Sequence, residues 1–300
     1  MAKRRDVIIG VIIVASFLVA FAFFGLMLAG LFSAGDGLDL AGFGGDVGVI
    51  EMFGEISEVT CRPVIKQIDR WAASSSIKAI VLHINSPGGA VAPSQEIYDA
   101  ILRAREKKPV VASMASVAAS GGYYIACAAD RIIANPGTLT GSIGVILQFH
   151  TFALLMKKIG VATETVKSGE LKDVGNYSRE MTEEENLMLR GVVMDTYEQF
   201  VEAVAEGRSK TKDDIYPLAD GSIFTGLQAY NLGLVDTLGG LHEAVALAGS
   251  LAGIEGEPTV VRPIERKKIG VWDILGGLAQ KLDKSVEEQI SGPQLMYLYK

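Results

Sequence analysis

The sequence is poor in the residues that hold metals or build disulfide frameworks. Among its 300 residues are only two cysteines, Cys61 and Cys127, and three histidines. Two cysteines are too few for a disulfide-built scaffold, and the sequence has neither a Cys-x-x-Cys pair nor a histidine-rich cluster. We therefore expect no metal and no cofactor, and we interpret the cysteines as two buried thiols. A single bridge between them stays open as an alternative.

An excess of basic residues is also missing. The chain has 28 Lys and Arg against 35 Asp and Glu, which gives a formal net charge of -7. Proteins that bind nucleic acid need a positively charged face to meet the phosphates, so the charge balance argues against nucleic acid as a partner. What the chain does have is apolar material: 49% of its residues are hydrophobic, which is enough for a globular core.

Charge is wholly absent from one long segment near the N-terminus. Residues 7–32 form a run of 26 uncharged and mostly apolar residues. A helix rises about 1.5 Å per residue, so this run can span the roughly 30 Å hydrocarbon core of a cell membrane. Lys3, Arg4 and Arg5 precede it and predict that residues 1–6 are cytoplasmic and the rest extracytoplasmic. We predict a single-pass transmembrane helix; a cleaved signal peptide is the alternative.

Three further regions follow the predicted anchor. Residues 33–46 contain five glycines and predict a flexible linker. Residues 47–254 fit one domain without internal repeats. Residues 255–300 are a C-terminal extension. Within it, residues 271–290 have amphipathic helical spacing, which suits docking on a neighbouring subunit, lying on the membrane surface or packing on their own domain.

Strand-like and helix-like segments alternate through the domain. Strands that are apolar throughout and separated by helices are typical of an α/β fold with parallel sheets covered by helices. Ligands in such folds bind beyond the carboxyl ends of the strands. We expect strands at 47–53, 79–84, 110–114, 131–134, 143–147 and 162–166, and helices at 63–73, 93–107, 123–129 and 182–207, the last with Thr182 as its N-cap.

Two glycine-rich turns lie at the expected ligand-binding end of the sheet. In the second, Ser120 stands between a strand and a helix with only small neighbours, so a substrate backbone can approach its hydroxyl. The amides of Gly121 and of Gly89, in the first turn, are placed to form an oxyanion hole, which typically contributes about 3 to 4 kcal/mol per donor in acyl transfer. A phosphate cradle and a purely structural turn are the alternatives.

A serine nucleophile needs a base to take its proton. The three histidines, His83, His150 and His242, are more typical of structural or surface positions, although spacing alone does not dismiss His150. A lysine serves as base when burial or nearby positive charge makes its ammonium lose a proton. Of the lysines between Ser120 and the long helix, we favour Lys172, which lies in a polar, glycine-bearing loop of the kind that often carries function.

The chain resembles the signal peptide peptidase A family across residues 47–253. Four segments carry the resemblance: Ser86-Pro87-Gly88-Gly89, residues 113–124 (SMASVAASGGYY), residues 138–145 (TLTGSIGV), and Lys167-Ser168-Gly169 through Lys172-Asp173 to Arg179-Glu180-Met181-Thr182. The resemblance implies a Ser/Lys-dyad protease with the fold shared by ClpP and the crotonases. It also implies one membrane segment, dome-shaped homo-oligomers and peptide substrates.

The resemblance assigns roles by position. Ser120 is then the nucleophile, Lys172 the general base, Gly89 and Gly121 the oxyanion donors, and Ser142 the residue that hydrogen-bonds the lysine amine. Two departures stand out: Ala115 replaces a frequent glycine, and Asn176-Tyr177 replaces a common Ser-Pro, which leaves open the path of the loop after Lys172. Residues 294–300 are expected to enter an active site as an extended peptide, as tails of related enzymes do.

The expected function is that of a membrane-anchored serine endopeptidase. Its substrates would be remnant signal peptides and other apolar segments near the membrane, bound as added β-strands. Two alternatives remain: a crotonase-like enzyme that acts on acyl thioesters without a serine nucleophile, and a non-catalytic membrane scaffold.

Overall fold

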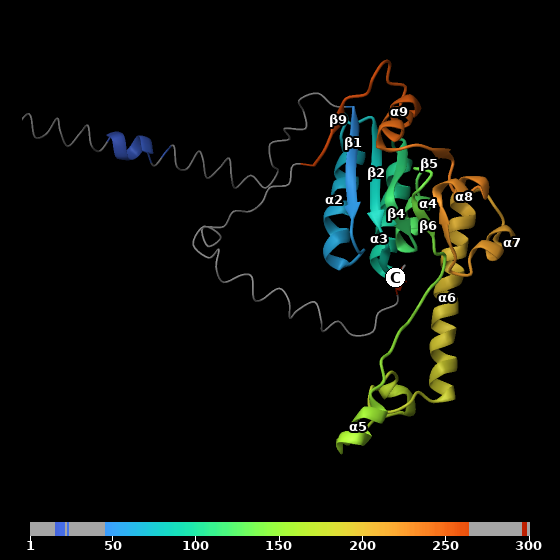
Figure 1. Cartoon of the computed structure of the whole chain (residues 1–300). Helices are drawn as coiled ribbons and strands as arrows, with labels where there is room; N and C mark the ends of the chain where they lie inside the picture. The colour runs from blue at the N-terminus through green and yellow to red at the C-terminus, as the bar shows by residue number, and fades with distance from the viewer. Residues whose placement is uncertain (1–15, 22, 24–45, 264–295, 299–300) are drawn as a thin grey trace, which may run out of the picture. The chain divides into compact units, whose positions relative to one another are not determined.

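The computed structural model describes residues 16–21, 23, 46–263 and 296–298 (Figure 1). The chain divides into two compact units, residues 1–43 and 44–300. In the first unit, residues 16–21 and 23 are helical and exposed. Most of the predicted transmembrane helix, residues 7–32, and of the linker, residues 33–46, lies outside the described residues. The helices that the structure does describe are all too short or too polar to cross a bilayer.

The second unit is built on an eight-stranded sheet whose pairings are nearly all parallel. The strand order is β7-β6-β4-β2-β1-β9, with β5 paired to β4 and β8 paired to β5; β6 and β7 alone are antiparallel. The bounds are β1 Val47–Phe53, β2 Ala79–Ser86, β4 Val110–Ala119, β5 Arg131–Ala134, β6 Leu139–Gly141, β7 Ile223–Thr225, β8 Thr237–Leu238 and β9 Val260–Val261. The predicted α/β class with a parallel sheet is confirmed.

The sheet separates two apolar layers because its strands bury residues on both faces. Alternate residues such as Ile50 and Leu82 pack with the helices α2 (Glu58–Ala73), α3 (Val91–Arg105) and α4 (Gly121–Cys127). The residues between them, such as Val49 and Val81, pack against α9 (Leu241–Leu251). This double burial explains why the strands are apolar throughout. Between α6 and α9 the chain forms α7 (Lys212–Ile215), η3 (Tyr216–Leu218) and α8 (Gly226–Asn231).

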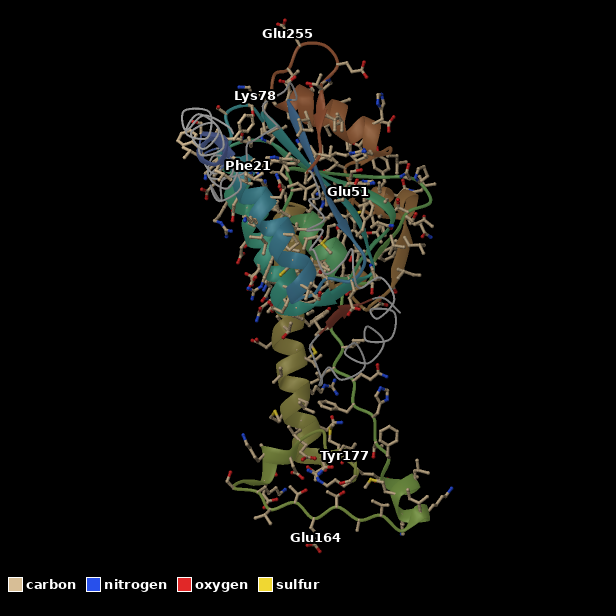
Figure 2. The ribbon with its side chains drawn as sticks, turned by 90° about the vertical axis from the view of Figure 1, so that its left-hand side faces the viewer. Phe21, Glu51, Lys78, Glu164, Tyr177 and Glu255 are labelled. Atoms are coloured by element: carbon tan, nitrogen blue, oxygen red, sulfur yellow. The ribbon has the colours of Figure 1, made fainter. Side chains whose placement is uncertain are left out.

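After β6 the chain leaves the sheet and forms an arm, which we define as residues 143–195. It carries α5 (Ala153–Ile159) and η2 (Glu170–Asp173) and returns through the long helix α6 (Glu183–Gly207). Neither α5 nor η2 contains a buried residue. Glu164 and Tyr177 lie at the end of the arm remote from the sheet (Figure 2). The arm therefore has little apolar packing of its own within one chain.

Two predicted strands in this region are wrong, and the predicted helix is confirmed. Residues 143–147 and 162–166 are not strands, although both runs are apolar. Ile143 is still buried in the core, and its carbonyl accepts a hydrogen bond from the amide of Gly221 at 3.1 Å, but the chain then leaves the sheet without forming a strand. Val166 is fully exposed. Helix α6 begins as expected, because the Thr182 hydroxyl accepts a hydrogen bond from the amide of Glu185 at 3.2 Å.

The C-terminal tail pairs with a short strand near the sheet. Met296–Leu298 form β10, which runs antiparallel to β3 (Gly88–Ala90) and places Tyr297 opposite Gly89. This agrees with the expectation that residues 294–300 bind as an extended peptide, since β3 carries a predicted oxyanion donor. The amphipathic segment 271–290 lies outside the described residues.

Candidate active site

Ser120 lies at a sharp turn between the end of β4 and the start of α4. Its backbone has φ 52° and ψ -118°, a conformation that costs a non-glycine residue about 1–3 kcal/mol. The turn is held by hydrogen bonds from the amide of Ser120 to the carbonyl of Gly141, 2.8 Å, and from the amide of Tyr124 to the carbonyl of Ser120, 2.8 Å. The predicted nucleophile therefore lies at a position where the backbone is strained.

The Ser120 hydroxyl is buried without a partner. The residue is 1% exposed, and its Oγ forms no hydrogen bond with any described residue. A buried hydroxyl that lacks a partner is costly, so its retention calls for an explanation. A hydrogen-bonding partner from outside the described part of the chain would satisfy the Ser120 hydroxyl.

The glycines around Ser120 allow the backbone to pack closely. A Cβ on Gly122 would lie 2.8 Å from the carbonyl oxygen of Ser86, so α4 can approach the end of β2 only without a side chain there. Gly121 is the first residue of α4, where the amide has no acceptor within its own helix. This is the position predicted for an oxyanion donor.

Gly89 lies in β3, which neighbours α4. The amide of Ile56 donates to the carbonyl of Gly88 and the amide of Ala90 donates to the carbonyl of Ile56, both at 2.8 Å. Because neighbouring residues of a strand direct their amides to opposite edges, the amide of Gly89 faces the edge occupied by β10. A Cβ on Gly89 would collide with the carbonyl oxygen of Ile56, so only glycine fits.

Ser142 lies beside the Ser120 turn. It follows Gly141, whose carbonyl accepts from the amide of Ser120, and its own amide donates to the carbonyl of Ser222 at 2.7 Å. Ser142 is 8% exposed and has φ 52°. The structure thus brings Ser120, Gly121, Gly89 and Ser142 into one region at the carboxyl end of the central strands.

Lys172 is not brought to this region within one chain. It lies in η2 and is exposed, and its amide donates to the carbonyl of Gly169 at 3.1 Å. Glu164 and Tyr177 precede and follow it in the chain, and both lie at the remote end of the arm (Figure 2). The single chain therefore presents the serine and the lysine of the predicted dyad on different parts of the fold.

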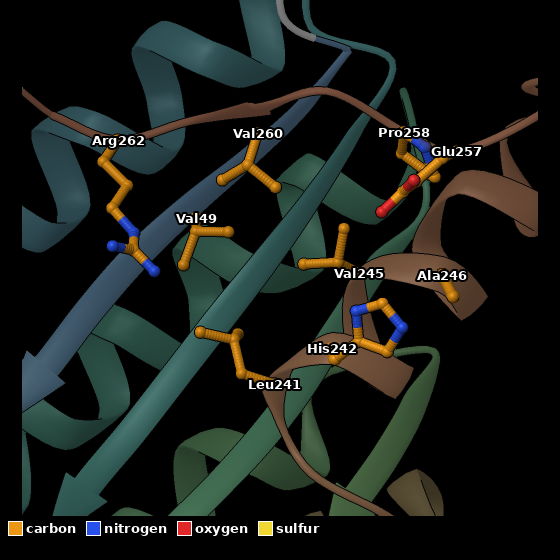
Figure 3. A pocket seen from close by; sticks show the side chains of 9 residues that line it. All are labelled: Val49, Leu241, His242, Val245, Ala246, Glu257, Pro258, Val260 and Arg262. Carbon is orange, nitrogen blue, oxygen red and sulfur yellow. The ribbon is translucent and has the colours of Figure 1, made fainter.

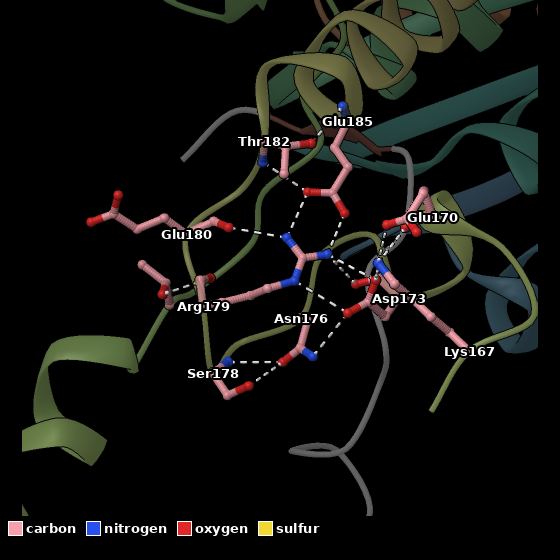
Figure 4. Close-up of polar contacts among 10 residues, drawn as sticks. Lys167, Glu170, Asp173, Asn176, Ser178, Arg179, Glu180, Thr182 and Glu185 are labelled. Carbon is pink, nitrogen blue, oxygen red and sulfur yellow. Dashed lines mark hydrogen bonds and ion pairs between the residues drawn. The ribbon is translucent and has the colours of Figure 1, made fainter. Parts of the chain in front are cut away.

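Charged residues to which the sequence analysis assigned no role surround the turn that carries Lys172. Arg179 lies between the carboxylates of Asp173 and Glu185, and Lys167 also pairs with Asp173, 3.1 Å (Figure 4). Hydrogen bonds from Arg179 lower the pKa of Glu185 to about 2 and hold the pKa of Asp173 well below its usual range. The Arg179-Glu180-Met181-Thr182 motif in the sequence pointed to this cluster. Nothing in the sequence indicated which carboxylates Arg179 contacts in the folded chain.

None of the three histidines, all in the described part of the chain, forms a hydrogen bond with the serine hydroxyl. His83 stacks edge-on with Phe53, its Nδ1 lies 3.2 Å from the Ser113 hydroxyl, and burial lowers its pKa. His150 is exposed on the arm. His242 borders a cavity of about 620 Å³ between α9, β1 and β9, lined mostly by apolar residues such as Val245 (Figure 3). This cavity lies on the face of the sheet covered by α9, not by α4.

Cys61 and Cys127 are free and buried, which confirms the interpretation as two thiols and excludes the bridge. Within the described residues, no three His, Cys, Asp or Glu side chains are grouped in a way that could hold a metal ion.

Comparisons with known proteins identify the family. The model of peptidase family S49 matches residues 103–255, and that of Clp protease matches residues 46–138. A putative protease of Synechocystis sp. is 42% identical over 231 residues, which cover 77% of this chain and 83% of that protein. A chloroplastic serine protease SPPA of Arabidopsis thaliana is 36% identical over 228 residues, 75% of this chain and 34% of that protein. A putative signal peptide peptidase SppA of Enterococcus faecium is 38% identical over 182 residues, 60% of this chain and 53% of that protein.

The S49 match begins before the Ser120 turn and extends past the arm, and the Clp match covers the strands that lead to that turn. The chain therefore belongs to peptidase family S49, the signal peptide peptidase A family, and is a serine peptidase.

Proposed function

We propose that the chain is a membrane-anchored endopeptidase in which Ser120 is the nucleophile and Lys172 the general base. The observation that carries the proposal is the buried Ser120 hydroxyl, which has no partner among the described residues and lies on a strained turn near the amides of Gly121 and Gly89. A hydroxyl held in this way is poised to react once a base reaches it.

The reaction follows from these groups. The Lys172 amine takes the proton of Ser120, whose Oγ attacks the peptide carbonyl, and the amides of Gly89 and Gly121 bind the oxyanion. The lysine ammonium then gives its proton to the leaving amine, which releases one product and leaves an acyl-enzyme. In the second half, the lysine takes a proton from water, the hydroxide attacks the ester, and Ser120 recovers its proton. Ser142 orients the amine.

We propose further that the dyad forms between neighbouring subunits. Lys172 is exposed, and Glu164 and Tyr177, which lie on either side of it in the chain, are at the end of the arm remote from the sheet that carries Ser120 (Figure 2), so we infer that another copy supplies the lysine. The arm also exposes apolar side chains that a second copy would bury, among them Leu154, Leu155, Ile159, Val161 and Val166. Catalysis would therefore require a homo-oligomer.

The substrates are peptides bound as a strand on β3. The tail strand β10 already occupies that edge and shows that an antiparallel chain fits there. The Enterococcus faecium relative bears the name signal peptide peptidase, which supports signal-peptide remnants as substrates. Residues 7–32 would anchor the enzyme in the cell membrane, with the catalytic domain outside the cytoplasm, and so keep it close to such peptides.

A serine-directed fluorophosphonate, mapped by mass spectrometry and combined with a peptide-cleavage assay, tests the proposal. Wild type should be labelled at Ser120, and its activity should rise with pH between about 6 and 10. Ser120→Ala and Lys172→Ala should lose both labelling at residue 120 and cleavage, whereas Lys107→Ala, an exposed control lysine, should behave as wild type.

Other outcomes would contradict the proposal. Wild-type turnover by Ser120→Ala would move the nucleophile to another residue, and a flat pH profile would remove the lysine base. Turnover of an acyl thioester without labelling would favour the crotonase-like reaction. Intact assembly without any peptide cleavage would favour the scaffold.

A further inference from the structure

We propose that Arg179 is a positioning residue for catalysis, which clamps the turn that carries Lys172 onto the first turn of α6. Because this role presupposes that Lys172 is the base, it deepens the proposed function and concerns how that lysine is presented to its serine.

The clamp consists of one guanidinium between two carboxylates (Figure 4). On one side, Arg179 Nη2 lies 2.8 Å from Asp173 Oδ1 and Nε lies 3.2 Å from Asp173 Oδ2. On the other side, Nη1 lies 2.8 Å from Glu185 Oε2, and Nη2 contacts Glu185 Oε1. Both carboxylates are thus bound in a bidentate manner, which fixes the orientation of each partner.

One end of the clamp is firmly anchored. The Glu185 side chain is only 2% exposed, and its Oε2 also accepts a hydrogen bond from the amide of Thr182 at 2.8 Å. Together with the Thr182 hydroxyl this forms a capping box at the start of α6. The 25-residue helix therefore provides a rigid point of attachment.

The other end is the turn that carries Lys172, which polar contacts hold. Besides the clamp, the side chain of Asn176 donates to Asp173 Oδ2 at 3.4 Å. The helix η2 has no buried residue and no side-chain cap. Asp173, directly after Lys172, joins this turn to Arg179. The Lys167 amine also binds the turn, through Asp173 Oδ1 at 3.1 Å and the carbonyl of Glu170 at 2.8 Å. Apolar packing within the chain does not fix this turn, so these polar contacts determine where the Lys172 backbone lies.

The clamp also balances charge at the turn. The charged groups that meet there are Lys167, Glu170 and Asp173 on its own segment, Arg179 after it and Glu185 from α6. Without Arg179, the carboxylates of Asp173 and Glu185 lose their shared cation and repel each other. Loss of the clamp should therefore alter the position of Lys172.

The test uses the full-length chain and compares Arg179→Met with Arg179→Lys, whose single ammonium cannot bind both carboxylates in a bidentate manner. For Arg179→Met we expect kcat for peptide cleavage to fall about 100-fold, with KM within about threefold of wild type, because a small misplacement of a catalytic group has effects of this size. Adding Asp173→Asn should not restore kcat. Arg179→Lys should also have a reduced kcat, because it cannot replace the bidentate contacts.

Arg62→Met is the matched control, because Arg62 forms only an exposed ion pair with Glu58 at 3.7 Å and should tolerate the change. The reference variants Ser120→Ala and Lys172→Ala separate the two proposals. If they are inactive while Arg179→Met keeps wild-type kcat, the clamp is overturned and the dyad stands; if they are active, the dyad fails. Loss of assembly in both Arg179 variants, or an activity loss that appears only in KM, would also overturn the positioning role.

Discussion

At the scale of single residues, the candidate site depends on two kinds of position: one where a side chain has no room and one where the backbone is strained. Ser120 adopts a positive φ, and Gly89 lies against the carbonyl of Ile56 where a Cβ has no room. Both are held by backbone hydrogen bonds from neighbouring strands. The reactive geometry is therefore built mainly from backbone, which places it with little conformational freedom.

Gly89→Ala should reduce peptide cleavage by about 100-fold or more, because the new Cβ would push β3 away from Ile56 and displace an oxyanion donor. Gly137→Ala is the control: nothing lies within 4 Å of its added Cβ, so activity should be unchanged. Steady-state kinetics on both variants make the comparison. An active Gly89→Ala enzyme would remove this amide from the oxyanion hole.

The two thiols should be unreactive in the folded protein. Burial raises the pKa of Cys127 to about 12 and also raises the pKa of Cys61, and the thiolate is the reactive form. With a chromogenic disulfide reagent at neutral pH, we expect almost no reaction in the native state and two thiols after unfolding without reductant. A result of zero thiols after unfolding would instead show a bridge.

At the scale of elements, ion pairs stabilise the arm, whereas apolar packing stabilises the sheet. The pKa of Glu185 is about 2 in the folded chain against an ordinary value of 4.5, because Arg179 and the Thr182 amide stabilise the carboxylate. A lowered carboxylate pKa contributes stability that is complete above about pH 4.5 and is lost as the pH falls toward 2. The start of α6 and the turn that it holds should therefore loosen in acid before the sheet does.

Hydrogen exchange of residues 165–185 as a function of pH checks this expectation. In wild type, protection should be constant above about pH 5 and should fall between about pH 4.5 and 2. In Glu185→Gln, protection should be lower at neutral pH and should lack this acid transition. Identical profiles for the two proteins would show that the carboxylate does not hold the arm.

The tail strand should compete with substrate, because β10 occupies the edge of β3 that faces the Gly89 amide. Deleting residues 294–300 should lower KM for a soluble reporter peptide several-fold and leave kcat nearly unchanged. A synthetic peptide with the sequence of residues 294–300 should inhibit the truncated enzyme competitively. An unchanged KM together with no inhibition would place the substrate on another surface.

At the scale of the whole molecule, the separation of Ser120 and Lys172 makes activity a property of the assembly. Ser120→Ala and Lys172→Ala should each be inactive alone. Co-expressed in equal amounts, they should recover about a quarter of wild-type activity, because random assembly pairs an intact serine with an intact neighbouring lysine at that frequency. Peptide cleavage by the purified mixed oligomer measures this recovery. A mixture that stays inactive would mean that both residues act from the same chain.

The parts of the fold that could be predicted from sequence are those governed by local rules. Strands that bury both faces read as apolar runs, as in β2 and β4, and the Thr182 cap marks the start of α6. The strands expected at 143–147 and 162–166 were wrong because an apolar run does not reveal whether a sheet edge is available to it. The ion-pair partners of Arg179 were missed for a related reason: motif reading does not report which charges meet in space.

The amino-acid sequence alone determined the α/β class, the candidate nucleophile and the glycine-rich turns around it, because apolar periodicity and the need for small residues are written locally along the chain. Only the tertiary structure decided that Lys172 lies on an arm apart from Ser120, that Arg179 ties its turn to α6, and that the tail pairs with β3. These are contacts between segments distant in sequence, and they follow from how the packed sheet directs each chain segment after it leaves the core.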